Sequence, residues 1–304
     1  MCIDVYNRKI VRILMKHIFT IFPFVIFFIS CGSNKSRNEP DNRPIVTVSI
    51  VPQKTFVQKI SGDDFDVHVL IPPGASPATY TLLPSQISNL GKSKAWFRIG
   101  HIGFEYSWKE KIEQANPMME VADLSEGLDL IKSDHSHERG HVSGVDPHIW
   151  MSPSLVKQFS KKIADVLIKL NPDREEIYKA NYSDFLKEIE QTDYYIKNAL
   201  SDYQGRHFIM FHPSLTYLAR EYGLIQHSLE SEGKEPSPQH MAEIMGLAKR
   251  ENIRVIYIQS EFDRENARVF AEETGGKIIE VSPLSPDWAE NLMNITNVLI
   301  ENFK

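Results

Sequence analysis

Cysteine is nearly absent from this chain of 304 residues, which has only Cys2 and Cys31. Both precede the first segment with the pattern of folded structure, which begins near residue 45. The body of the protein therefore has neither a disulfide nor a cysteine ligand. Its stability has to come from a hydrophobic core or a bound ligand.

An apolar run long enough to span a bilayer is also missing from the start of the chain. The run "IFTIFPFVIFFIS", Ile18 to Ser30, falls short of the ~20 residues that a spanning helix needs, and Pro23 interrupts it. Basic residues precede it and Cys31 follows it. This order is typical of a secretory signal peptide, which we place at residues 1–30. The basic residues are Arg8, Lys9, Arg12 and Lys16.

The end of this signal resembles a bacterial lipobox, in which the cysteine becomes the lipidated first residue of the mature protein. The matching residues are "FISC", with Phe28 where that pattern usually has leucine. A plain signal peptide is the alternative, and Met15 competes with Met1 as the true start. We expect an exported protein at the periplasmic face, anchored through Cys31 and followed by a polar tether over residues 31–44.

Positive charge is in deficit. The formal net charge is −6, and it becomes −9 without residues 1–30, because that segment holds four basic residues and one acidic residue. An acidic body argues against nucleic acid as a partner and suits cations. With 42% hydrophobic and 24% charged residues, the chain has the composition of a globular protein that can bury a core.

Short β-branched runs alternate with helical segments, a pattern that predicts an α/β fold with mainly parallel sheets. The first series of runs covers residues 45–51, 65–71 and 94–100; the second reads "HFIMF", "LIQHSL", "RVIYIQ" and "KIIEV". Ser-Pro pairs at Ser237 and Ser285 predict helix starts. We therefore expect two α/β lobes with flanking helices, over residues 45–171 and 204–304.

One long helix is predicted between the lobes, over residues 172–203. This segment has no glycine and no proline after Pro172, and its apolar residues recur at helical spacing. At 1.5 Å per residue such a helix is about 48 Å long. A helix of this length joining two lobes would be stiff and would permit little hinge closure.

The segment "HSHERGHVSGVDPHIW" holds four histidines, and His137-Glu138-x-x-His141 spells the H-E-x-x-H motif of zinc proteases. That motif works on a helix, with both histidines on one face and the glutamate as general base. Gly140 falls inside the motif and no apolar stripe supports a helix. We interpret His135, His137 and His141 as an auxiliary loop that gathers metal or is only solvated. A secreted zinc hydrolase stays the alternative.

His148 and His212 are better candidates for a metal site. His148 follows Pro147 in a constrained stretch, and His212 follows the predicted strand "HFIMF". The carboxyl ends of strands are where open α/β sheets place their ligands. One histidine comes from each side of the predicted long helix, and two neutral imidazoles facing each other across an interface can begin a zinc site.

These segments together resemble the zinc and manganese solute-binding proteins of bacterial ABC importers, a family that includes cell adhesion-like members. "GVDPHIWMSP" and "FIMFHPSLTYLAREYGL" resemble the motifs of two histidine ligands, and "VLIPPGASPATYTLLPSQ" and "VSPLSPDW" resemble the two other ligand segments. The resemblance covers roughly residues 45–304. It implies two lobes joined by a rigid helix, capture of Zn²⁺ or Mn²⁺, delivery to a membrane permease, and no enzymatic activity; we expect a monomer.

Two positions depart from the family pattern. Ala78 stands where the family has a histidine and Ser282 where it has an aspartate, so only His148 and His212 carry over. Other strand ends offer replacements, which are His101 after "KAWFRIG" and Glu261 after "RVIYIQ". We therefore expect a site of His101, His148 and His212, with Glu261 or water as the fourth ligand. The alternatives are a solvated loop carboxylate at Glu261 and a solute-binding protein for a non-metal ligand.

Overall fold

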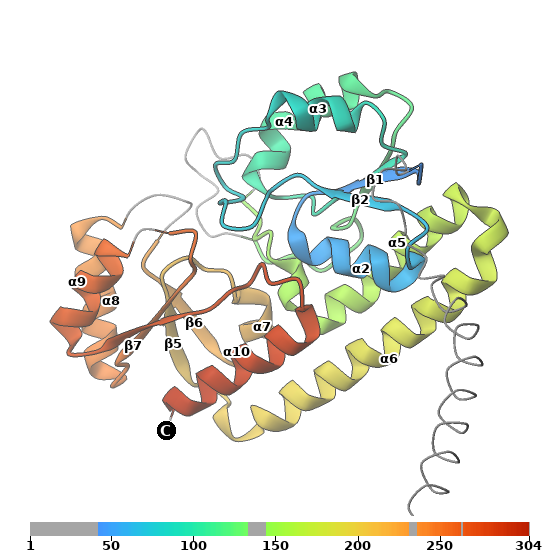
Figure 1. Ribbon diagram of the computed structural model, residues 1–304. Coiled ribbons are helices and arrows are strands. Elements are labelled where there is room, and N and C mark those ends of the chain that lie inside the picture. The colour runs from blue at the N-terminus through green and yellow to red at the C-terminus, as the bar shows by residue number, and fades with distance from the viewer. Residues whose placement is uncertain (1–41, 133–143, 231–235, 263, 304) are drawn as a thin grey trace, which may run out of the picture. The chain divides into compact units, whose positions relative to one another are not determined.

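The computed structural model describes residues 42–132, 144–230, 236–262 and 264–303 (Figure 1). The predicted signal peptide, the tether up to residue 41 and the auxiliary loop with His135, His137 and His141 lie outside the described residues. Among the described residues, the search for a helix with the length and apolarity of a membrane span finds none.

The first lobe is built on a four-stranded parallel sheet in the order β2-β1-β3-β4. Helices α2, α3 and α4 connect its strands. The elements are β1 (Ile45–Val48), α2 (Val51–Ser61), β2 (Asp66–Val69), α3 (Pro84–Leu90), β3 (Ala95–Arg98), α4 (Gly103–Ala115) and β4 (Glu120–Asp123). A 3₁₀ turn at Ile149–Met151 and helix α5 (Pro153–Leu170) follow.

The second lobe repeats this arrangement with the order β6-β5-β7-β8, again with every pair parallel. The two parallel sheets with flanking helices confirm the predicted fold class. The elements are β5 (His207–Met210), α7 (Thr216–Glu221), β6 (Ile225–Ser228), α8 (Pro238–Arg250), β7 (Val255–Ile258), α9 (Glu265–Thr274), β8 (Lys277–Glu280) and α10 (Trp288–Phe303).

Two local features differ from expectation. Strand β4, "EVAD", was not predicted, because two of its four residues are acidic and it lies at the edge of its sheet. The helix start predicted at Ser285 is wrong, since α10 begins at Trp288. The carbonyl of Pro286 instead accepts hydrogen bonds from the Thr55 hydroxyl and the Trp288 N–H, which hold this stretch as a turn against the first lobe. The Ser237 cap is confirmed, because its hydroxyl accepts from the His240 N–H.

Helix α6 (Glu175–Ala199) occupies most of the segment predicted to join the lobes, with 3₁₀ turns at Pro172–Arg174 and Ser201–Tyr203. Its 25 residues give a length of about 38 Å. The helix packs against α5 and α2 of the first lobe and against α10 at the end of the chain, as Figure 1 shows. Both lobes therefore rest on one continuous helical element.

The hydrophobic core runs from one lobe into the other. One apolar cluster joins the first sheet, α5, α6 and α10 to one face of the second sheet, where it includes Phe208 and Met210 of β5. Ile209, between them, belongs to a separate cluster under α8 and α9 on the opposite face. This alternation is what a strand buried on both sides requires. Because the larger cluster spans both lobes, separating them would expose apolar surface.

Two tryptophans link the lobes through hydrogen bonds of their indole N–H groups. The indole N–H of Trp288 donates to the Trp150 carbonyl at 2.6 Å, and the indole N–H of Trp150 donates to the Pro283 carbonyl at 2.9 Å. The Trp288 ring also meets the edge of Phe56 at 5.5 Å between centroids and lies 6.4 Å from Phe185. The segment from Pro283 to Trp288 is thereby fixed to the first lobe.

We expect Trp288→Ala to lower the free energy of unfolding by about 3–5 kcal/mol, because it empties a buried site. Trp288→Phe keeps most of the ring but leaves the Trp150 carbonyl without its donor, which costs about 1–3 kcal/mol. Urea-induced unfolding measures both. Tyr194→Ala is the control, since that side chain is 71% exposed and its loss should change little. A Trp288→Ala protein as stable as the parent would show that this junction does not hold the lobes.

Candidate metal centre

A small cavity of about 80 Å³ lies between the two lobes. It has room for an ion with a few water molecules, and too little for a sizeable organic solute. Its walls are mostly apolar, with polar groups at a few positions. The lining residues whose side chains could bind a cation are Ser76 and His148 from the first lobe and His212, Ser214, Gln259 and Glu261 from the second.

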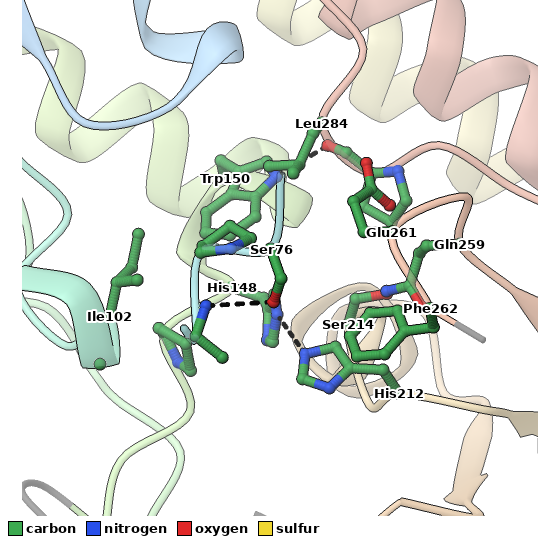
Figure 2. A pocket seen from close by; sticks show the side chains of 15 residues that line it. Ser76, Ile102, His148, Trp150, His212, Ser214, Gln259, Glu261, Phe262 and Leu284 are labelled. Atoms are coloured by element: carbon green, nitrogen blue, oxygen red, sulfur yellow. Dashed lines mark hydrogen bonds between the residues drawn. The ribbon is translucent and has the colours of Figure 1, made fainter. Parts of the chain in front are cut away.

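The structure brings His148 and His212 together, as the sequence predicts. His148 directly precedes the 3₁₀ turn at Ile149–Met151 and is 8% exposed, and His212 lies two residues beyond β5. Their Nε2 atoms are 3.2 Å apart, with the rings at 72° to each other (Figure 2). This separation allows a single ion to bind both nitrogens, since zinc takes imidazole nitrogen at about 2.0–2.1 Å.

Each of these imidazoles has a carboxylate behind it. The Nδ1 of His148 lies 2.9 Å from Asp146 Oδ1, and the Nδ1 of His212 lies 2.5 Å from Glu230 Oε2. A carboxylate that accepts a hydrogen bond from the Nδ1–H group fixes the tautomer and leaves the lone pair of Nε2 for a metal. Each histidine is therefore oriented with its Nε2 toward the other.

Asp146 and Glu230 were missed by the sequence analysis, although each had a signal. Asp146 stands two residues before His148, and its Oδ1 also accepts the His148 backbone N–H at 2.8 Å. Glu230 lies two residues beyond β6, and the pairing of Met210 with Ser228 puts it level with His212 on the neighbouring strand. Glu230 could have been found from the sequence by aligning the two predicted strands in parallel register.

The electrostatics keep the site ready for a cation. Burial lowers the pKa of His212 below its usual value, although the hydrogen bond to Glu230 acts in the opposite direction. For Asp146, burial alone would raise the pKa, but the charge of His148 and the hydrogen bonds from it lower the pKa overall. At neutral pH His212 is therefore uncharged and Asp146 is ionised, which is the state that metal binding needs.

Aromatic rings restrict the motion of both imidazoles. Phe262 stacks on His212 with 4.8 Å between centroids and 21° between planes, and Trp150 lies 5.1 Å from His148. Trp150 is the same residue that fastens the second lobe through its indole N–H. Trp150 thus contacts the His148 ring and also holds the second lobe, so the position of His148 depends on the junction between the lobes.

Glu261 lines this cavity and also a second one, of about 250 Å³, that contains Ser282. In Figure 2 it lies beside Leu284, on the side away from the histidine pair. Ser282 does not line the first cavity, whereas Ala78 does and brings no donor atom from its side chain. The two positions that depart from the predicted family pattern therefore place no histidine or carboxylate in this cavity.

His101 follows β3 as expected, but it is not among the residues that line the cavity. Its Nδ1 lies 2.7 Å from the Tyr106 hydroxyl in the first turns of α4. The turn before it requires glycine, since Gly100 has a φ of +113° and a Cβ there would collide with Ser125. Ile102 and Gly103 line the cavity instead.

Within the described ranges, histidine, cysteine, aspartate and glutamate side chains form no group of three or more that could hold a metal ion. The histidine pair nevertheless fits a divalent cation chemically. It offers two neutral nitrogens, each oriented by a buried carboxylate, in a small cavity with oxygen-bearing side chains on its wall. Zn²⁺ and other ions that accept imidazole suit this donor set.

Comparison with known proteins agrees with this chemistry. The family described as "Zinc-uptake complex component A periplasmic" matches residues 46–303. A crystal structure of ZnuA is 35% identical, with a TM-score of 0.81, over 86% of this chain and all of that one. A ZnuA deletion mutant with zinc bound is 36% identical, with a TM-score of 0.79, over 86% and 98% of the two chains.

Curated relatives point the same way. The high-affinity zinc uptake system protein ZnuA of Bacillus subtilis (strain 168) is 26% identical over 274 residues, which are 86% of this chain and 85% of the relative. The zinc-binding lipoprotein AdcA of Streptococcus pneumoniae (strain ATCC BAA-255 / R6) is 25% identical over 92% of this chain, which spans 58% of AdcA. Because the family match covers nearly the whole folded body, this chain belongs to the family of periplasmic component A of zinc-uptake complexes.

Proposed function

We propose that this protein is the extracytoplasmic metal-binding subunit of an ABC importer, which captures Zn²⁺ and delivers it to a membrane permease. The observation that carries the proposal is the pair of Nε2 atoms 3.2 Å apart in the cavity between the lobes. Mn²⁺ is the alternative cargo, and the protein acts as a monomer. The zinc-uptake and zinc-binding names of the relatives support this cargo.

Capture in this account is equilibrium binding, followed by docking to the permease, with no covalent step. His148 and His212 supply the two nitrogen ligands, and Asp146 and Glu230 hold their Nδ1 protons. Glu261 or water supplies the remaining oxygen ligand, since zinc favours four donors. His101 stays a predicted ligand, although its ring contacts Tyr106 in this structure.

Two rival functions are less well supported. A zinc hydrolase would need Glu138 as general base beside an open metal position, and the motif His137-Glu138-x-x-His141 lies outside the described residues. The relatives are named for zinc uptake and zinc binding, and none of the names given above describes a hydrolase. A non-metal solute would need more room than a cavity of about 80 Å³ offers.

We expect His148→Ala and His212→Ala each to weaken zinc binding by about 100-fold or more, above the 10–100-fold typical of residues that only orient a ligand. Competition with a chromogenic chelator measures the affinity. His68→Ala is a matched control, because His68 also pairs with an aspartate two residues before it, Asp66, but lies outside the cavity.

The same titration assigns the remaining candidates. A loss with His101→Ala comparable to that of the other two would show that its ring turns to the metal, and an unchanged affinity would exclude it as a ligand. Glu261→Gln distinguishes a carboxylate ligand from water in the same way. If His148→Ala and His212→Ala both bind zinc like the parent, the metal-transport proposal is wrong.

The affinity for zinc should fall as the pH drops, because protons compete for the Nε2 lone pairs. An unperturbed histidine has a pKa of about 6.5. Burial lowers the pKa of His212, so competition at that residue begins only at a lower pH than in a solvated imidazole. Measurements of affinity between pH 5 and 7.5 test this, and a constant affinity over that range would contradict a site built from histidines.

We also propose residues 1–30 as a signal peptide, Cys31 as the lipid anchor and residues 31–44 as the tether, followed by lobes over 45–171 and 204–304 around the joining segment 172–203. The name of AdcA as a lipoprotein supports the anchor.

Cys31→Ala should move the exported protein from the membrane fraction to the soluble fraction. Cys2→Ala removes the other cysteine and should leave the distribution unchanged. Membrane association that survives Cys31→Ala would disprove lipidation at this residue.

A further inference from the structure

Gln259 is a buried polar residue in the wall of the cavity, and the oxygen of its side-chain amide has no hydrogen-bond partner among the described residues. Its side chain lines the cavity beside Ser214 and His212 (Figure 2), and the residue is 4% exposed. Its Nε2 donates to the Ser214 hydroxyl at 2.7 Å. Its Oε1 is buried and has no hydrogen-bond partner among the described residues.

The sheet register places Gln259 level with the metal-binding histidine. Met210 of β5 pairs with Tyr257 of β7, so His212 and Gln259 each follow two residues beyond that pair. Side chains two residues apart point to the same face of a sheet. Met210 and Tyr257 both belong to the core cluster shared by the lobes, so the strands are fixed below the cavity.

A buried amide oxygen without a donor costs about 1–3 kcal/mol, because it has lost its water on folding. Such groups are rare, and one in a binding cavity indicates a partner that arrives with the ligand. An ion held by two imidazoles keeps positions for water, since zinc takes four donors. Water bound to a cation is a strong hydrogen-bond donor, and the unused oxygen of Gln259 is an acceptor.

We propose that Gln259 is a positioning residue for the captured ion, with its Oε1 accepting a hydrogen bond from a water molecule bound to that ion. This inference rests on the proposed function, because it takes the histidine pair as the metal site. A water held in this way supplies one of the oxygen ligands that zinc needs beyond the two imidazoles. The Ser214 hydroxyl fixes the amide by accepting from its Nε2.

The test compares Gln259→Leu, which is similar in size and has no acceptor, with Gln259→Glu, which keeps one. We expect Gln259→Leu to weaken zinc binding about 10- to 100-fold, the range for partners that orient a metal site. Gln259→Glu should bind zinc at least as tightly as the parent. Ser260→Ala, at the exposed neighbouring residue, is the control and should not change the affinity.

Urea-induced unfolding without metal separates this role from a structural one. The metal-free Gln259→Leu protein should be about as stable as the metal-free parent, because the change removes an unpaired buried oxygen and also the donor to the Ser214 hydroxyl. Zinc should then stabilise the variant less than it stabilises the parent. A variant that is less stable without metal but binds zinc normally would show that Gln259 only supports the fold.

The outcomes also separate this inference from the proposed function. If the parent binds zinc through His148 and His212 while Gln259→Leu binds equally well or better, the amide does not hold a metal-bound water and this inference alone is wrong. If the purified parent does not bind zinc, the proposed function fails first and the inference fails with it.

Discussion

The attachment of the second lobe to the first through two indole N–H groups is the constraint on which the proposed metal centre depends. Each lobe contributes one histidine, so a shift of either lobe by one or two ångströms would separate the two Nε2 atoms. Trp150 and Trp288 prevent that shift with hydrogen bonds to backbone carbonyls across the junction. Helix α6 and the apolar core shared by the lobes also oppose a shift of one lobe against the other. The rigidity gives a site that is formed before the ion arrives.

Burial and hydrogen bonding at this junction determine the protonation of His212 and Asp146. Burial lowers the pKa of His212 and so favours its neutral form, while His148 lowers the pKa of Asp146 and so favours the carboxylate. Both changes favour the binding of a cation. Burial alone would make two buried carboxylates unfavourable, and each is compensated by the Nδ1 proton of its histidine. The acidic body of the chain, with a formal charge of −9 without residues 1–30, adds a long-range attraction for cations.

Sequence patterns predicted the parts of this protein that follow from local periodicity. The parallel strands other than β4 and the long helical segment could be found that way. His148 and His212 could be found as well, because one follows a constrained turn and the other a buried strand. The direction of the His101 side chain could not be predicted from local periodicity, because it depends on the positive φ of Gly100 and on the hydroxyl of Tyr106. Glu230 and Gln259 required the register between strands, which depends on how distant segments pair.

The central claim is that one ion binds both imidazoles in the cavity between the lobes, and X-ray absorption at the zinc edge tests it most directly. The zinc-loaded protein should show a first shell of nitrogen and oxygen at about 2.0–2.1 Å, with the outer-shell scattering of two imidazole rings. The same spectrum from His148→Ala should lose one ring. A first shell without imidazole scattering would contradict the account.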